Sequence, residues 1–122
     1  MTAYRYRQPL ASQDEPSRPG YEFAGLDAGV CLKKTPDGAP AGISIDPWSL
    51  AYADDTRVEP ATTVAESFSV PLYPQLDKSV GVGDCVRGWV VFEVAKGKRP
   101  VRTTYTPTNT DTPARSLQWV IG

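Results

Sequence analysis

The clearest pattern in the chain is the alternation of side-chain types within residues 83–94, where a Gly-Asp turn leads into the alternating residues. The even positions are small or apolar: Val86, Gly88, Val90, Phe92 and Val94. The odd positions are mostly polar, redox-active or amphipathic, with Val91 as the exception: Cys85, Arg87, Trp89 and Glu93. A period of two residues predicts a β-strand with one buried face.

A second long strand is predicted over residues 21–33, where apolar side chains again occupy the even positions. Its odd positions include Gly25, Asp27, Gly29 and Cys31. Small residues on that face predict that another element packs closely against it. Shorter patterns predict strands over residues 3–8, 43–53, 68–72, 100–105 and 116–121. Their spacing predicts that residues 82–94 and 100–105 form a hairpin around the turn at 95–98.

Proline and glycine occur too often along the chain for long helices to form. The 122 residues include 12 prolines and 10 glycines, and these separate the predicted strands. The length is sufficient for one hydrophobic core. We therefore expect an all-β fold, an immunoglobulin-like antiparallel β-sandwich of about seven short strands. We expect residues 1–122 to form one domain, in which residues 1–20 supply a partial first strand and a loop.

The net charge and the absence of histidine exclude several classes of binding partner and catalytic site. Thirteen basic and fourteen acidic residues give a formal net charge of −1, so we expect no nucleic-acid partner. Histidine is absent, which excludes Ser-His-Asp and Cys-His catalysis and imidazole metal ligands. We expect no cofactor and no catalytic residues. No stretch approaches the roughly 20 apolar residues of a membrane span, and the N-terminal residues lack the apolar core of a secretory signal.

The two cysteines occupy matching positions on the two long predicted strands. Cys31 ends one strand and Cys85 begins the other, both opposite the aliphatic face of their strand. This placement favours a disulfide that clasps the face away from the core, and hence an oxidising location. The alternative is a pair of free thiols in a cytosolic protein.

Several segments together resemble a known family. They are Gly25, Leu26, Val30 and Cys31; the Asp-Pro-Trp-x-Leu segment at 46–50; the Gly-Asp-Cys-x-x-Gly-Trp-x-x-Phe-Glu-Val strand at 83–94; and Tyr-Thr-Pro at 105–107. Over roughly residues 21–121 the chain is similar to the immunoglobulin-like domain of uncharacterised secreted bacterial proteins and lipoproteins, which includes immunoprotective extracellular antigens of actinobacteria. The resemblance implies a secreted or envelope-anchored β-sandwich and supplies no catalytic residues. Any lipid anchor is expected upstream of this segment.

Acidic turn residues are weak candidates for a cation site. Asp54, Asp55 and Asp84 carry oxygen ligands of the kind calcium prefers, but no contiguous calcium-loop motif is present, and aspartate is common in turns. We therefore predict no metal. The same carboxylates would have to carry any enzymatic activity, which makes an enzyme an unfavoured third hypothesis.

Arg87 and Trp89 form the candidate interaction patch. Both lie at odd positions of the predicted strand with the clearest alternation. If they are exposed, they form an amphipathic surface of the kind enriched at interfaces. If a loop such as residues 56–70 covers them, they form a second small core instead. The leading hypothesis is thus a non-enzymatic secreted or cell-envelope binding module of unknown ligand and protein or envelope partner. The alternative is a secreted protease inhibitor or effector that presents the proline-rich loops at 60–74 and 106–113.

Overall fold

The computed structural model describes residues 2–10, 19–32, 38, 41–45, 47–61, 70–74, 78–106 and 117–121. These ranges contain nine strands and no helix. The strands are β1 (Thr2–Arg7), β2 (Tyr21–Cys31), β3 (Ala41–Ile43), β4 (Trp48–Ala51), β5 (Arg57–Val58), β6 (Lys78–Val80), β7 (Cys85–Ala95), β8 (Arg102–Tyr105) and β9 (Leu117–Val120). All named strands pair antiparallel, which confirms the all-β class.

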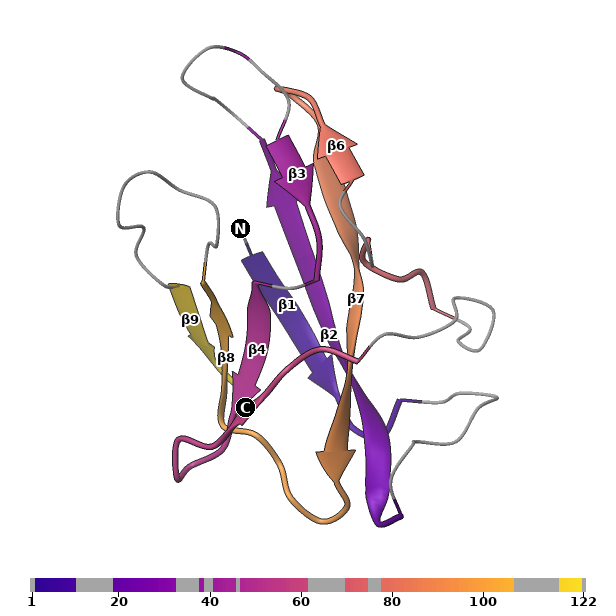
Figure 1. Cartoon of the computed structure of the whole chain (residues 1–122), viewed down its shortest axis with the longest axis vertical. Helices are drawn as coiled ribbons and strands as arrows, with labels where there is room; N and C mark the ends of the chain where they lie inside the picture. Colours follow the sequence, from indigo (N-terminus) through magenta and orange to yellow (C-terminus); the bar gives the residue numbers. More distant parts are fainter. Residues whose placement is uncertain are drawn as a thin grey trace.

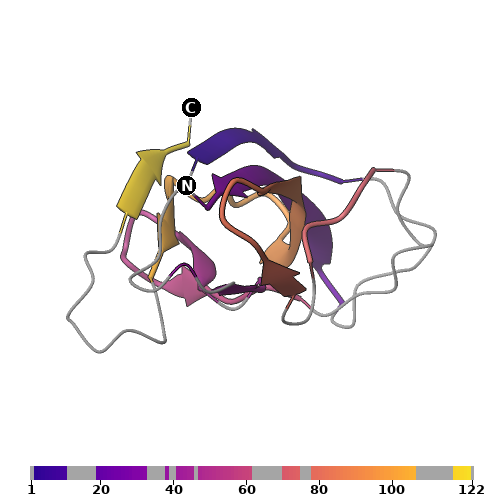
Figure 2. The same ribbon diagram turned by 90° about the horizontal axis from the view of Figure 1, so that it is seen from above.

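The strands form three sheets, and the two larger ones enclose the core. One has the order β1-β2-β7 and faces the four-stranded sheet β5-β4-β8-β9, while β3 and β6 pair separately (Figures 1 and 2). Trp48 and Leu50 of β4 are fully buried against the even-numbered residues of β2 and β7. The even positions of the long strands thus face the core, as their alternation predicts.

β7 has a partner along both of its edges. On one side it pairs with β2 over their full lengths, from Tyr21↔Ala95 to Cys31↔Cys85. On the other side, the Trp89 N–H donates to the Pro71 carbonyl at 2.9 Å, and Trp89 accepts from the Tyr73 N–H at 2.9 Å. This segment passes so close that a Cβ at Gly88 would lie 2.4 Å from the Tyr73 nitrogen. Glycine at position 88 is therefore a packing requirement.

The predicted hairpin between residues 82–94 and 100–105 is wrong. β8 lies in the other sheet, between β4 and β9, and does not pair with β7. Because β2 and residues 71–73 already occupy the edges of β7, β8 has no place beside it. The connection crosses between the sheets, and the Val101 N–H donates to the Ala51 carbonyl at its far end.

Cys31 and Cys85 are bonded to each other, which confirms the predicted disulfide. They are directly opposed residues of β2 and β7, and both are exposed on the side of the sheet away from the main core. The bond closes a loop with a sequence separation of 54.

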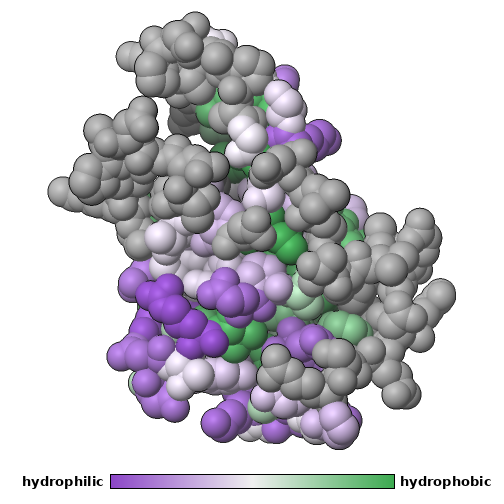
Figure 3. Space-filling model, viewed as in Figure 1, coloured by the Kyte–Doolittle hydropathy of each residue, from purple (hydrophilic) through white to green (hydrophobic). Residues whose placement is uncertain are grey.

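The surface is divided unevenly between polar and apolar residues. In Figure 3 hydrophilic side chains gather at the lower left, over the end that carries the β4–β5 turn, and hydrophobic areas are smaller and separate. Within the described ranges, no helix has the length and hydropathy to cross a membrane.

Candidate functional site

A β-bulge in β1 determines which side chains share the outer face of the β1-β2-β7 sheet, meaning the face away from the main core. Ala3 pairs with Ala28 and Arg5 pairs with Asp27, so the register shifts at Tyr4. An extra residue of this kind reverses the alternation of the strand on one side of it. The bulge therefore places Tyr4 on the same face as Arg5 and Arg7, whereas Ala3 and Tyr6 pack toward the main core.

Two glycines of β2 make room for aromatic rings on this outer face. A Cβ at Gly25 would lie 2.8 Å from Cε3 of Trp89, and one at Gly29 would lie 3.1 Å from Cε2 of Tyr4. The rings therefore lie directly over the strand backbone. This confirms the close packing predicted from the small residues at odd positions of β2.

Asp27 lies between the two glycines and is buried, with 3% of its surface exposed. Arg87 of β7 donates to it through both Nε (3.1 Å to Oδ1) and Nη2 (2.9 Å to Oδ2). Arg5 of β1 places its Nε 3.7 Å from Oδ2. The side-chain hydrogen bond to Asp27 raises the pKa of Arg87 above its ordinary value. One buried carboxylate in the central strand thus ties the two flanking strands together.

The arginines also stack on the aromatic rings. The Arg87 guanidinium carbon lies 3.7 Å from the centre of the Tyr4 ring. Those of Arg5 and Arg7 lie 5.7 and 5.1 Å from the centre of the Trp89 ring. Cations over aromatic faces are attracted by the ring quadrupole. We call this cluster the arginine face; its members are Tyr4, Arg5, Arg7, Asp27, Arg87 and Trp89.

The two residues of the sequence-predicted patch have different environments. The Arg87 side chain is 55% exposed, but Trp89 is only 6% exposed. Trp89 lies beside a second small core of Leu10, Phe23 and Val91, against which Val70 and Leu72 pack. Of the two outcomes that the sequence leaves open, Trp89 therefore follows the second and is buried beside a small core, where its ring lies under Arg5 and Arg7, whereas Arg87 follows the first and is exposed.

Asp54 and Asp55 are neighbours in the β4–β5 turn, Asp84 lies apart from them, and all three have local partners. Asp54 accepts a hydrogen bond from the Thr56 N–H at 3.0 Å, which lowers the pKa of Asp54. Asp55 forms an ion pair with Arg102. Asp84 accepts from the Gly81 N–H at 3.2 Å in the β6–β7 turn, at the opposite end of the molecule in Figure 1. Within the described ranges, no three His, Cys, Asp or Glu side chains gather as metal ligands would.

No protein-family model, curated protein or solved structure matches this chain. Its function is therefore inferred from the geometry of its own surfaces.

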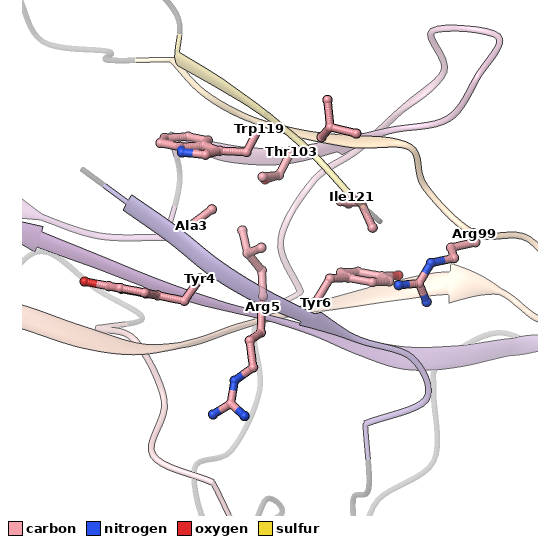
Figure 4. Close-up of a pocket in the computed structure, with 10 residues that line it drawn as sticks. Ala3, Tyr4, Arg5, Tyr6, Arg99, Thr103, Trp119 and Ile121 are labelled. Atoms are coloured by element: carbon pink, nitrogen blue, oxygen red, sulfur yellow. The ribbon is translucent and has the colours of Figure 1, made fainter.

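A groove of about 300 Å³ separates β1 from β9. Figure 4 shows Trp119, Thr103 and Ile121 on one side of it and Ala3 and Tyr6 on the other, while Arg5 points away. Tyr6 donates to Gln8 Oε1 at 2.6 Å, and burial, followed by the nearby Tyr52, raises the pKa of Tyr6. The groove is at the lower end of the size range of ligand sites.

Sequence reasoning missed four members of the arginine face: Tyr4, Arg5, Arg7 and Asp27. One signal was available, because Asp27 is the only charged residue between Phe23 and Cys31 in a strand of otherwise small and apolar residues. A buried carboxylate requires cationic partners on the neighbouring strands. The bulge had no such signal, since Tyr4 and Arg5 follow a regular alternation in the sequence.

Proposed function

We propose that this chain is a non-enzymatic binding module that holds anionic groups of its ligand on the arginine face. The observation that carries the proposal is the imbalance of charge in this cluster, which contains three arginines and one carboxylate. The face thus has a local surplus of two positive charges in a chain whose formal net charge is −1. Attraction of an anion would depend on this local field rather than on the charge of the whole protein.

The guanidinium groups are held in place before any ligand arrives. Asp27 binds one edge of Arg87 through Nε and Nη2, and the Tyr4 ring supports its plane. Such a guanidinium has further N–H donors on its other edge. A fixed fork of donors matches carboxylate, sulfate or phosphate oxygens at little additional cost in side-chain entropy.

An extracellular or cell-envelope location is part of this proposal. The exposed Cys31–Cys85 bond supports it, because such bonds persist in oxidising compartments. The resemblance to the immunoglobulin-like domains of secreted bacterial proteins supports it independently. Acidic polysaccharides and other anionic envelope polymers are ligands of suitable chemistry in that location. The alternative of a protease inhibitor depends on residues 60–74 and 106–113, many of which lie outside the described residues, and no observation favours it.

Isothermal titration with two polyanions tests the proposal. Heparin provides sulfate groups and polygalacturonate provides carboxylates, and neutral dextran is the ligand control. We expect binding of at least one polyanion that weakens as salt shortens the Debye length from about 30 Å at 0.01 M to about 8 Å at 0.15 M.

Arg7→Gln is the informative variant, because Arg7 stacks on Trp89, whereas the ion pairs of Asp27 described above involve Arg5 and Arg87. Arg57→Gln in β5 is the matched control, since it removes one exposed arginine from the other large sheet. We expect about fivefold weaker binding for Arg7→Gln, equivalent to about 1 kcal/mol, and little change for the control. Equal losses in both variants, or no binding of either polyanion, would refute the proposal.

A further inference from the structure

The groove between β1 and β9 is bordered by two sheet edges. β1 is the outermost strand of the three-stranded sheet, and β9 is the outermost strand of the four-stranded sheet. Among the described residues, no strand pairs with the outer side of either one. Unpaired strand edges offer rows of backbone donors and acceptors to another chain.

The hydrogen bonds of the neighbouring strands show which groups of β9 point into this opening. The Thr106 N–H donates to the Pro47 carbonyl, which sets the directions of the backbone groups along β8. Those of Thr104 and Arg102 therefore point toward β4. Those of Thr103, one position along, point toward β9. The Ile121 N–H donates to the Val101 carbonyl in the same register. Successive residues of a strand alternate in direction. The N–H and C=O groups of Gln118 and Val120 therefore point away from β8 toward the open edge.

The inner surface of the groove is apolar between these edges. Leu26 forms part of it, and Tyr6, Trp119 and Ile121 line its sides (Figure 4). Val120 is 89% exposed, the highest value among the exposed large hydrophobic residues of the described chain. An extended peptide alternates its side chains at the same period as these walls, so every second side chain would enter the groove.

The charged residues that line the groove indicate which charge the bound peptide would carry. Arg99 is the charged residue at one end of the groove, Arg5 borders it with a guanidinium that points away, and no carboxylate is among the described residues that line it. The Arg99 guanidinium carbon lies 5.0 Å from the centre of the Tyr6 ring, at one end of the opening. An acidic residue is the complementary partner for this end.

We propose that the groove binds an extended peptide segment of a partner protein, which adds as a strand to the edge of β9. Its alternate side chains are apolar and enter the groove, and an acidic side chain meets Arg99. Main-chain hydrogen bonds to Gln118 and Val120 provide affinity, and the apolar positions provide selectivity. A second copy of this chain fits less well, because pairing of β9 with another β9 would leave the space against β1 unfilled.

The test begins with a displayed library of random nine-residue peptides, selected on the full chain. We expect enrichment of Val, Ile or aromatic residues at alternate positions together with Asp or Glu near one end. Val120→Pro removes the outward-pointing N–H without removing a hydrogen bond to β8, and Val120→Thr keeps that N–H in an equally exposed position. We expect about tenfold weaker binding of the selected peptide for Val120→Pro and less than about twofold change for Val120→Thr.

Hydrogen exchange provides a measurement that does not depend on how the proline variant folds. Addition of the peptide to the unmodified chain should slow exchange at the amides of Gln118 and Val120 by at least about tenfold and leave Thr103 unchanged. Arg7→Gln should not alter peptide affinity, which separates this site from the arginine face. Selection without an alternating pattern, unchanged exchange at Gln118 and Val120, or a stable dimer formed through β9 in sedimentation equilibrium at the protein concentration of the peptide assay would each overturn the proposal.

Discussion

Gly88 is the residue at which the smallest substitution has the largest expected effect. A methyl group there would lie 2.4 Å from the Tyr73 nitrogen and 2.6 Å from the Leu72 carbonyl carbon, and backbone atoms cannot rotate away as a side chain can. We expect Gly88→Ala to lower the free energy of unfolding by about 3 kcal/mol, measured by urea denaturation. Gly29→Ala is the control.

At Gly29 the nearest atom is Cε2 of the Tyr4 ring at 3.1 Å, at the end of a side chain that is 49% exposed. That ring can move, so the expected loss is at most about 1 kcal/mol. A Gly88→Ala protein as stable as the Gly29→Ala protein would show that residues 71–73 do not press on β7 as described.

Asp27 and Arg87 should be energetically coupled. Asp27 is buried and Arg87 is half-exposed, so their two hydrogen bonds are only partly screened by water. In a double-mutant cycle of Asp27→Asn and Arg87→Gln, we expect a coupling free energy of about 1–2 kcal/mol. The measurement is the difference in unfolding free energy among the four proteins. A coupling near zero would mean that the pair forms without stabilising the strands.

At the scale of elements, the long β2–β7 ladder and its disulfide act together. The bond closes a loop with a sequence separation of 54 and joins residues that the ladder already opposes. The chain-entropy estimate for such a loop is about 4 kcal/mol. We expect the Cys31→Ser/Cys85→Ser double variant to lose about this amount in urea denaturation, with the folded strand content unchanged in circular dichroism.

The same loss should follow reduction of the unmodified chain, detected as a mass increase of two hydrogens. If the reduced protein were as stable as the oxidised one, the pairing of β2 with β7 would provide the stability without the disulfide.

The strands that the sequence predicted well are those with a strong alternation, β2 and β7. Their buried residues and the Cys31–Cys85 pairing followed from position parity, because one face of each strand packs against the core. The hairpin of β7 with β8 failed for a physical reason: spacing along the chain does not show which edges are already occupied. The bulge at Tyr4 was equally hidden, since it depends on pairing with β2 and not on the pattern of β1.

At the scale of the whole molecule, stability should fall in alkaline solution. Burial raises the pKa of Tyr73 and Tyr105 above the ordinary value of 10.0, and burial also raises that of Tyr6. The folded state therefore retains phenolic protons that the unfolded state loses above about pH 10. Below that pH the stabilisation is fully present, and above it each such tyrosine removes up to about 1.4 kcal/mol per pH unit.

Thermal melting as a function of pH, combined with absorbance titration at 295 nm, measures this loss. Tyr105→Phe removes one of the three protons and should make the decline less steep. A melting temperature that stays constant well above pH 10 would contradict the burial of these hydroxyl groups.

The strand edges that remain unpaired determine where one molecule can associate with another in concentrated solution. β7 is covered on both sides, β5 is only two residues long, and β1 carries Arg5 and Arg7, so each of these strands resists pairing with a neighbouring molecule. β9 has Gln118 and the highly exposed Val120 but no charged residue. Among the strands of the two larger sheets, β9 is therefore the one at which aggregation in concentrated solution should begin, and Val120→Lys is the substitution that would protect this edge most directly.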